Sequence, residues 1–161
     1  MTDLYRILVV CTGNVCRSPM AEGLLALHVK DAHLDHVVVE SGGTHAPEGS
    51  AASTFARAAA SELGANIQGH RARYLNRAMV KDADLILVME QAHQYFILSA
   101  LPEEAEGKVR MIRAFDCNAP SEKDVPDPIG ADLGYYRDIA RMIDDCCKGV
   151  VNYLKKTGRG D

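Results

Sequence analysis

Short apolar runs alternate along the chain with longer segments in which apolar residues recur every three or four positions. The short runs predict buried strands at Ile7–Val10, Val37–Glu40, Leu85–Met89 and Val109–Ile112. The longer segments predict helices at Ser18–Lys30, Ser53–Leu63, Leu75–Val80, Glu90–Ser99 and Asp132–Lys155. Because strands that alternate with helices form parallel sheets covered on both faces, we predict an α/β fold with an open four-stranded parallel sheet.

Length and composition indicate one domain of ordinary size. The chain has 161 residues, of which 47% are hydrophobic, and this is enough for a core that folds unaided. We predict that the domain covers residues 1–156 and that a frayed tail follows from Thr157 to Asp161.

Charge and the N-terminal segment exclude several classes of protein. The net charge is −4 and the basic residues are scattered, so nucleic acid is not an expected partner. The segment Met1–Arg6 carries an acid and leads into only a few apolar residues, which is not the pattern of a signal peptide. No apolar run approaches the roughly 20 residues of a membrane span. We therefore expect a cytoplasmic protein that does not bind membranes.

The five cysteines do not form a recognisable metal or disulfide pattern. Their number is odd and their positions are irregular, unlike a disulfide framework. Cys11 and Cys16 lack the spacing of a zinc site, Cys146 and Cys147 are adjacent, and Cys117 is isolated. We predict that the protein uses no metal and no cofactor.

An eight-residue loop, Cys11–Ser18, lies between the first predicted strand and the first predicted helix. We expect Ser18 to cap this helix and Pro19 to occupy its first position. Unpaired backbone N–H groups and the positive end of the helix dipole then face the loop, an arrangement that binds anions. Gly13 and Asn14 tolerate the positive φ that makes successive N–H groups converge on one centre.

The two ends of this loop carry a nucleophile and a phosphate clamp. A cysteine at a helix N-terminus beside an arginine is favoured as a thiolate, and Ser18 can donate a hydrogen bond to the Cys11 sulfur. Arg17 offers a planar fork that binds two phosphate oxygens at once. The alternative is a buried structural cysteine in a glycine-containing turn. A nucleotide-binding loop is unsupported, because neither G-x-x-x-x-G-K-[ST] nor G-x-G-x-x-G follows the strand.

The segment Val9–Gly23 resembles the phosphate loop of the low-molecular-weight protein tyrosine phosphatases, and Val125–Pro128 resembles their general-acid loop. Further matches in the family's order are Glu40–Thr44, His70–Arg73 and Ala83–Met89. The resemblance implies that Cys11 is the nucleophile, Arg17 the phosphate clamp and Asp127 the proton donor. It implies a phosphate-binding loop formed by Thr12, Gly13, Asn14, Val15, Cys16, Arg17 and Ser18. It also implies that Asn14, Ser41 and His70 hold this loop in its strained shape.

The acid loop must supply a proton to the leaving oxygen and later a base for water, and one aspartate can serve both steps. Asp127 lies between Pro126 and Pro128, which restrict the backbone and so can aim its carboxylate. Asp124 is the local rival, and an Asp-Pro turn without a catalytic role is the alternative. The joint match of two distant motifs favours Asp127.

Substrate choice depends on a few residues around the loop. Many tyrosine phosphatases of the family have two tyrosines directly after Asp-Pro, whereas this chain has Ile129–Gly130 and so resembles the related bacterial protein-arginine phosphatases. The arginine phosphatases favour threonine at the position of Val15, whereas the tyrosine phosphatases have an apolar residue there. Thr12 is compatible with both groups of enzymes. We predict a phosphotyrosine protein or peptide as substrate, with phosphoarginine as the alternative. We also expect inhibition by phosphate-like oxyanions.

Two further functions and one regulatory role remain as hypotheses. Arsenate reductases with a similar loop need two more cysteines on a mobile segment, and this chain has none between Cys16 and Cys117. A phosphopeptide-binding module without catalysis would be expected to lose the nucleophile or the acid, and both are present. Cys16 either forms a reversible disulfide that protects Cys11 from overoxidation or is a small inert residue.

Overall fold

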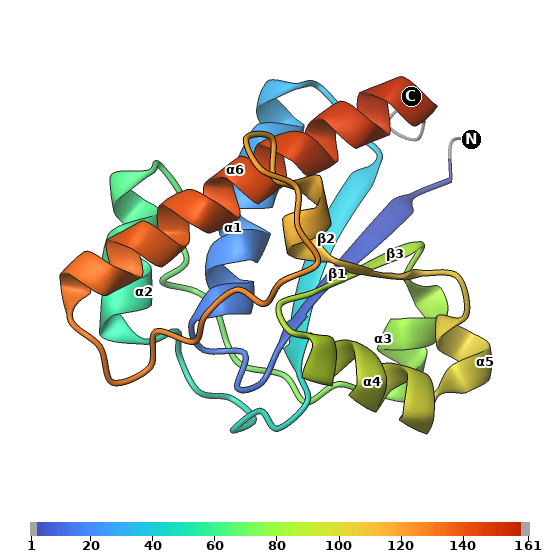
Figure 1. The fold of residues 1–161 in the computed structure, drawn as a ribbon, viewed down its shortest axis with the longest axis horizontal. Helices are drawn as coiled ribbons and strands as arrows, with labels where there is room; N and C mark the ends of the chain where they lie inside the picture. Colours follow the sequence, from blue (N-terminus) through green and yellow to red (C-terminus); the bar gives the residue numbers. More distant parts are fainter. Residues whose placement is uncertain (1–2, 159–161) are drawn as a thin grey trace.

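The computed structural model describes residues 3–158, and its centre is a four-stranded sheet in the order β2-β1-β3-β4 (Figure 1). Every neighbouring pair of strands is parallel. This confirms the predicted open parallel sheet. The strands are β1 (Tyr5–Cys11), β2 (Val37–Gly43), β3 (Leu85–Val88) and β4 (Val109–Met111).

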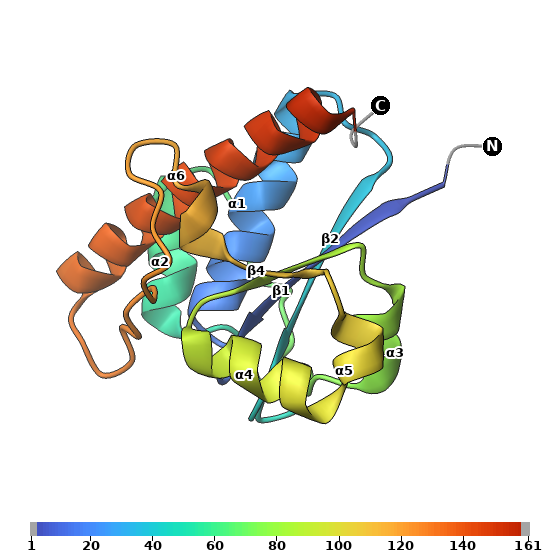
Figure 2. The ribbon, with the colours of Figure 1, turned by 45° about the vertical axis from the view of Figure 1, so that its right-hand side comes forward.

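Helices cover both faces of the sheet, as predicted. Figures 1 and 2 show α1, α2 and α6 on one face and α3, α4 and α5 on the other. The five predicted helices are present, and two short elements, α5 and the 3-10 helix η1, were not predicted. The helices are α1 (Arg17–Asp31), α2 (Thr54–Glu62), α3 (Arg77–Asp82), α4 (Gln91–Ala100), α5 (Pro102–Ala105), η1 (Ile112–Phe115) and α6 (Leu133–Thr157).

The alternation of side chains along β1 divides the core in two. Ile7 and Val9 belong to the cluster packed against α1, α2 and α6, whereas Leu8 and Val10 belong to the cluster on the α3, α4 and α5 side. Successive side chains of a strand point to opposite faces, and here both faces are covered. This explains why β1 appears in the sequence as a continuous apolar run rather than as an alternating one.

The start of α1 differs from the prediction. Cys16 is the N-cap and Arg17 the first helical residue, so Ser18 is not the cap and Pro19 is not at the first position. The Ser18 hydroxyl is engaged instead by Cys11 and Asn14 inside the loop. Pro19 is still tolerated, because backbone N–H groups in the first turn of a helix have no partner within the helix.

The C-terminal helix defines the end of the described chain. Helix α6 extends to Thr157, and Gly158 caps it with a positive φ of 69°. The rest of the predicted tail, residues 159–161, lies outside the described residues. Within residues 3–158, every helix is too short or too polar to span a membrane.

Candidate active site

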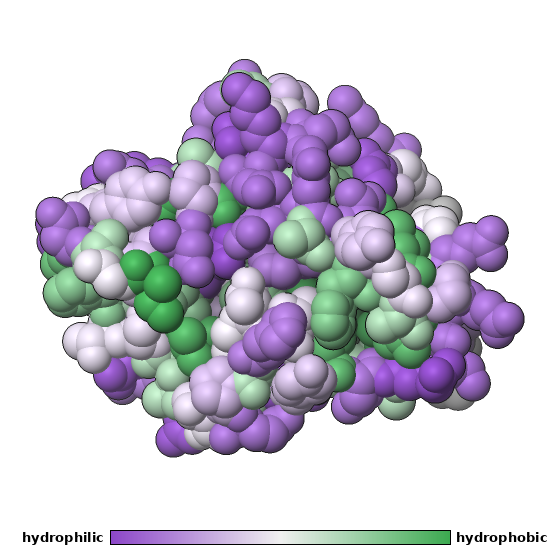
Figure 3. All heavy atoms as spheres, turned by 60° about the horizontal axis from the view of Figure 1, so that its bottom comes forward, coloured by the Kyte–Doolittle hydropathy of each residue, from purple (hydrophilic) through white to green (hydrophobic). Residues whose placement is uncertain are grey.

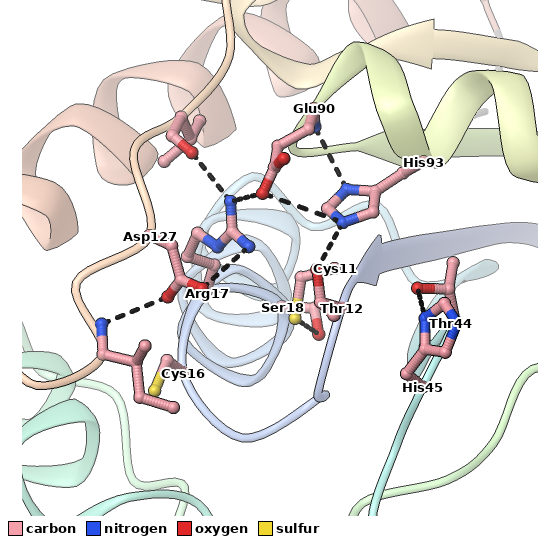
Figure 4. A network of polar contacts seen from close by, with 12 residues as sticks. Cys11, Thr12, Cys16, Arg17, Ser18, Thr44, His45, Glu90, His93 and Asp127 are labelled. Atoms are coloured by element: carbon pink, nitrogen blue, oxygen red, sulfur yellow. Dashed lines mark hydrogen bonds and ion pairs between the residues drawn. The ribbon is translucent and has the colours of Figure 1, made fainter.

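The loop from Cys11 to Ser18 connects the carboxyl end of β1 to the first turn of α1 (Figure 4). Residues that follow β2 and β3 meet it at the same edge of the sheet, because the carboxyl ends of parallel strands lie together. The backbone N–H groups of Thr44 and His45, just after β2, donate to the carbonyls of Cys11 and Thr12.

Cys11 lies at the base of the loop with two hydrogen-bonding groups at its sulfur. Its side chain is buried, its Sγ is 2.9 Å from Ser18 Oγ, and the Asn14 N–H donates to the sulfur over 3.3 Å. Ser18 Oγ itself accepts a hydrogen bond from Asn14 Nδ2. The hydroxyl proton of Ser18 is therefore free to point at the sulfur, where it stabilises a thiolate.

Asn14 fixes the shape of the loop. It is fully buried and has a positive φ of 54°, the left-handed region that makes neighbouring N–H groups converge. Its Nδ2 also donates to Ser41 Oγ at 3.0 Å, and its Oδ1 accepts from the Arg73 N–H at 2.9 Å. His70 Nε2 lies 2.7 Å from the Asn14 carbonyl. The predicted supporting residues, Asn14, Ser41 and His70, are thus brought together.

Ser41 continues this polar chain away from the loop. Its hydroxyl accepts from Asn14 and donates to the Glu22 carboxylate on α1. Because a hydroxyl has one proton and two lone pairs, these two bonds are compatible with each other. The loop is consequently tied to both β2 and α1.

Arg17 is buried at the mouth of the loop and has three oxygen neighbours. Its Nη1 lies 2.6 Å from Glu90 Oε2 and donates to the Val125 carbonyl at 2.8 Å. Its Nη2 lies 3.6 Å from Asp127 Oδ2. The guanidinium therefore connects the loop to the segment after β3 and to the acid loop.

The two candidate acids point in different directions. Asp127 is half-exposed, with one carboxylate oxygen toward Arg17 and the other accepting from the Ile129 N–H at 3.1 Å. Asp124 accepts a hydrogen bond from the Gln91 N–H, 2.8 Å away, at the start of α4. Asp124 is thus turned toward α4, whereas Asp127 is next to Arg17.

Cys16 is buried and contacts two hydroxyl groups. Its Sγ lies 3.4 Å from Ser53 Oγ and 3.4 Å from Tyr136 Oη. Burial, followed by the hydrogen bond with Cys16, raises the pKa of Tyr136 to about 12. Tyr136 is therefore a neutral, buried neighbour of the loop, packed edge-on against Phe55.

The surface on this side of the molecule is mixed. Figure 3, in which the bottom of Figure 1 comes forward, shows hydrophobic groups as separate patches among hydrophilic ones. Exposed hydrophobic side chains include Ile129 in the acid loop, which is 66% exposed, and Phe55, which packs against Tyr136. No double tyrosine follows Asp127, so the acid loop presents an aliphatic side chain.

Sequence reasoning missed Glu90, His93 and Tyr136. Glu90 and His93 come just after β3, which is paired with β1, and that placement is the signal that could have found them. His93 Nε2 lies 2.8 Å from Thr12 Oγ1. Among residues 3–158, no cluster of three or more His, Cys, Asp or Glu side chains is arranged to hold a metal ion.

Comparison with known proteins places this site in a known context. The model of the family described as "Low molecular weight phosphotyrosine protein phosphatase" matches residues 6–159. A low molecular weight protein-tyrosine-phosphatase of Streptomyces coelicolor is 32% identical over 162 residues, which cover 97% of each chain. A protein-arginine-phosphatase of Geobacillus stearothermophilus is 38% identical over 133 residues, which cover 83% of this chain and 84% of the relative.

A solved structure has the same fold. It is a mutant of the YwlE arginine phosphatase with a phosphorylated active site serine, and it matches with a TM-score of 0.88 at 29% identity. The match covers 97% of this chain and 99% of that chain. These similarities therefore include the loop, the acid loop and all four strands.

Proposed function

The chain belongs to the low molecular weight phosphotyrosine protein phosphatase family, and from this premise we propose that it hydrolyses phosphotyrosine in proteins through a phosphocysteine at Cys11. Membership makes it a phosphatase that acts on phosphorylated proteins. The roles of individual residues rest on one observation: Asp127 Oδ2 lies 3.6 Å from the Nη2 of the buried Arg17, across the mouth of the loop that holds Cys11. The proposed acid thus lies beside the proposed clamp, which belongs to the same loop as Cys11.

In the first step the Cys11 thiolate attacks phosphorus, so that a P–S bond forms and the bond from phosphorus to the tyrosine oxygen breaks. Asp127, in its protonated form, gives its proton to the departing oxygen. The loop N–H groups and the Arg17 guanidinium bind the phosphoryl oxygens and stabilise their negative charge in the transition state. The phosphorylated active site serine of the YwlE mutant supports a covalent intermediate at this position.

In the second step water attacks phosphorus and the P–S bond breaks. Asp127, now a carboxylate, takes the proton from that water, which returns the acid to its starting form. The sulfur leaves as a thiolate, and Ser18 Oγ at 2.9 Å with the Asn14 N–H at 3.3 Å stabilises it. The products are the dephosphorylated tyrosine side chain of the protein substrate and inorganic phosphate.

The substrate preference for phosphotyrosine is supported by Val15. This side chain is half-buried, packs against the larger core cluster and presents an apolar group within the loop. An apolar wall suits an aromatic ring better than a guanidinium. Phosphoarginine is the second candidate, because the Geobacillus stearothermophilus relative is a protein-arginine-phosphatase and the acid loop carries Ile129–Gly130.

Side-by-side hydrolysis of phosphotyrosine and phosphoarginine peptides tests the proposal. We expect a higher kcat/KM for phosphotyrosine, inhibition by vanadate, and no turnover by Cys11→Ser, which should still bind vanadate. In Val15→Thr the ratio of phosphoarginine to phosphotyrosine kcat/KM should rise, since the hydroxyl replaces an apolar contact. A wild-type protein that prefers phosphoarginine would instead establish the second candidate.

A further inference from the structure

His93 connects the phosphate loop to the start of α4, and its hydrogen bonds specify one tautomer (Figure 4). Its Nδ1 lies 3.1 Å from the backbone nitrogen of Glu90. Because a backbone N–H can only donate, Nδ1 is the acceptor and has no proton. In the neutral ring the proton is then on Nε2, which donates to Thr12 Oγ1 over 2.8 Å.

Each end of the His93 network touches a group proposed for catalysis. Thr12 directly follows the nucleophile Cys11. On the other side, the Glu90 side chain accepts the His93 backbone N–H in a reciprocal capping box, while Glu90 Oε2 holds Arg17 Nη1 at 2.6 Å. The His93 backbone N–H therefore holds the carboxylate that pairs with Arg17, while its imidazole joins the Glu90 backbone to Thr12, the second residue of the loop.

The charged groups around the imidazole favour different forms of the ring. Burial lowers the pKa of His93 below its ordinary value of 6.5. The negative charge of Glu90 opposes this, the positive charge of Arg17 lowers the pKa further, and the carboxylates of Asp124 and Asp127 on the acid loop raise it. The combined effect is a lowered pKa, so the ring is neutral at pH 7.

We propose that neutral His93, with its proton on Nε2, is a positioning residue that aligns Thr12 and the Glu90–Arg17 pair for phosphoryl transfer. This role rests on the proposed phosphatase function. Protonation would place a second N–H on Nδ1, facing the Glu90 N–H, and would remove that hydrogen bond. The alignment is therefore lost as the pH falls through the pKa of His93, and kcat/KM should decline on the acid side.

The test compares His93→Gln with His93→Ala in kcat/KM against pH, using an aryl phosphate as substrate. Glutamine is neutral at every pH and can accept from the Glu90 N–H while donating to Thr12. We expect His93→Gln to keep most activity at pH 7. On the acid side, its profile of kcat/KM against pH should show one titrating group fewer than that of the wild-type protein. His93→Ala should lose roughly tenfold in kcat/KM, as expected when a buried polar network loses a partner. His33→Asn, at an exposed histidine with positive φ, is the matched control and should keep the wild-type profile.

Three outcomes would overturn the role of His93. Wild-type kcat/KM in His93→Ala would show that the alignment is unnecessary. Equal losses in both variants with an unshifted acid limb would mean that the ring only fills space. A proton on Nδ1 in the ¹⁵N NMR spectrum of the wild-type protein would contradict the tautomer. That spectrum is independent of turnover, whereas inactivity of the wild-type protein on all phosphorylated substrates would refute the proposed function instead.

Discussion

Glu90 Oε2 lies 2.6 Å from Arg17 Nη1, and the same nitrogen donates to the Val125 carbonyl 2.8 Å away. Nη1 is thus engaged by the protein through one ion pair and one hydrogen bond. Because a buried guanidinium needs a charge partner, Glu90 stabilises Arg17 at a site where its side chain is only 2% exposed. In the proposed mechanism, the two-pronged contact with a phosphoryl group therefore falls to Nη2 and Nε.

Arg17→Lys should therefore impair the enzyme severely although the charge is kept. A single ammonium group cannot contact Glu90, the Val125 carbonyl and two phosphate oxygens at the same time. We expect kcat/KM for an aryl phosphate to fall by about 100-fold or more, a loss of ~3 kcal/mol in transition-state stabilisation. Arg141→Lys, in the exposed pair with Asp138, should have wild-type kinetics. Near-normal activity in Arg17→Lys would show that the guanidinium does not stabilise the transition state.

Oxidation should convert Cys11 and Cys16 into a reversible disulfide. Peroxide oxidises the Cys11 thiolate to a sulfenic acid, and attack by the Cys16 sulfur then forms the S–S bond and releases water. Cys146 and Cys147 should not compete, because burial raises the pKa of Cys146 to about 12 and raises that of Cys147 well above its ordinary value.

Mass spectrometry after mild peroxide checks this prediction. The Cys11–Cys16 link should appear together with a loss of activity that thiol reverses. In Cys16→Ser recovery should be poorer, whereas Cys117→Ser, at an exposed cysteine, should behave like wild type. Equal recovery of all three proteins without a link would leave Cys16 as a packing residue beside Ser53 and Tyr136.

Gly149 should be essential for the packing of α6 on η1. A Cβ at this position would lie 1.5 Å from the Phe115 carbonyl oxygen, so the backbone of one element must move. We expect Gly149→Ala to lower the free energy of unfolding by about 3 kcal/mol or more in urea titrations. Gly134→Ala in the same helix is the control, because its Cβ would meet only the Asp132 carboxylate at 3.5 Å. If both variants unfold at the same urea concentration, the close approach does not matter.

The fold could be predicted largely because its signals are local. Strand β1 is covered on both faces, so its apolar run is continuous, and each long helix repeats its pattern over several turns. Helix α5 and η1 each span four residues, which is too short for a helical period to be visible. Ser18 bonds to Cys11 instead of capping the helix, and its hydroxyl also accepts from Asn14. The Asn14 side chain is held in turn by Ser41 of β2 and by the Arg73 backbone, which are distant in sequence.

From the residues alone, the site could be predicted only where the chain itself supplies the spacing, and Ser41, His70 and Asp127 were indicated by the family resemblance instead. Cys11 and Arg17 belong to one loop, and their approach follows from the strand and helix on either side. Glu90 reaches Arg17 because β3 pairs with β1, a relationship between distant segments that no local pattern records. His93 appears in the sequence as an ordinary helical residue. Its ring contacts Thr12, 81 positions away, and this contact exists only in the folded chain.

The match of two distant motifs favoured Asp127 over Asp124 in the sequence, and the fold adds that the two carboxylates lie in different surroundings. Asp124 Oδ1 accepts the Gln91 N–H at 2.8 Å, and its backbone carbonyl accepts from Arg113 Nη1 at 3.0 Å. This half of the acid loop is held against α4 and η1. Asp127 lies beyond it, with its side chain 43% exposed and its Oδ2 3.6 Å from Arg17 Nη2, which supports its proposed role as the acid.

Asp127→Asn should therefore give a defect that grows with the pKa of the leaving group. The leaving oxygen of an alkyl phosphate or of phosphotyrosine is basic and needs a proton. The nitrophenolate of a nitrophenyl ester is weakly basic and departs nearly unaided. A series of aryl phosphates should show a steep decline of kcat/KM with leaving-group pKa in this variant and a shallow one in wild type, because kcat/KM reports the step in which the leaving group departs. Asp124→Asn is the matched control, because an amide oxygen can still accept from the Gln91 N–H, and its decline should match wild type. If Asp127→Asn slows every ester equally while Asp124→Asn steepens the decline, the proton comes from Asp124, and the acid loop must turn that carboxyl group away from α4 during the reaction.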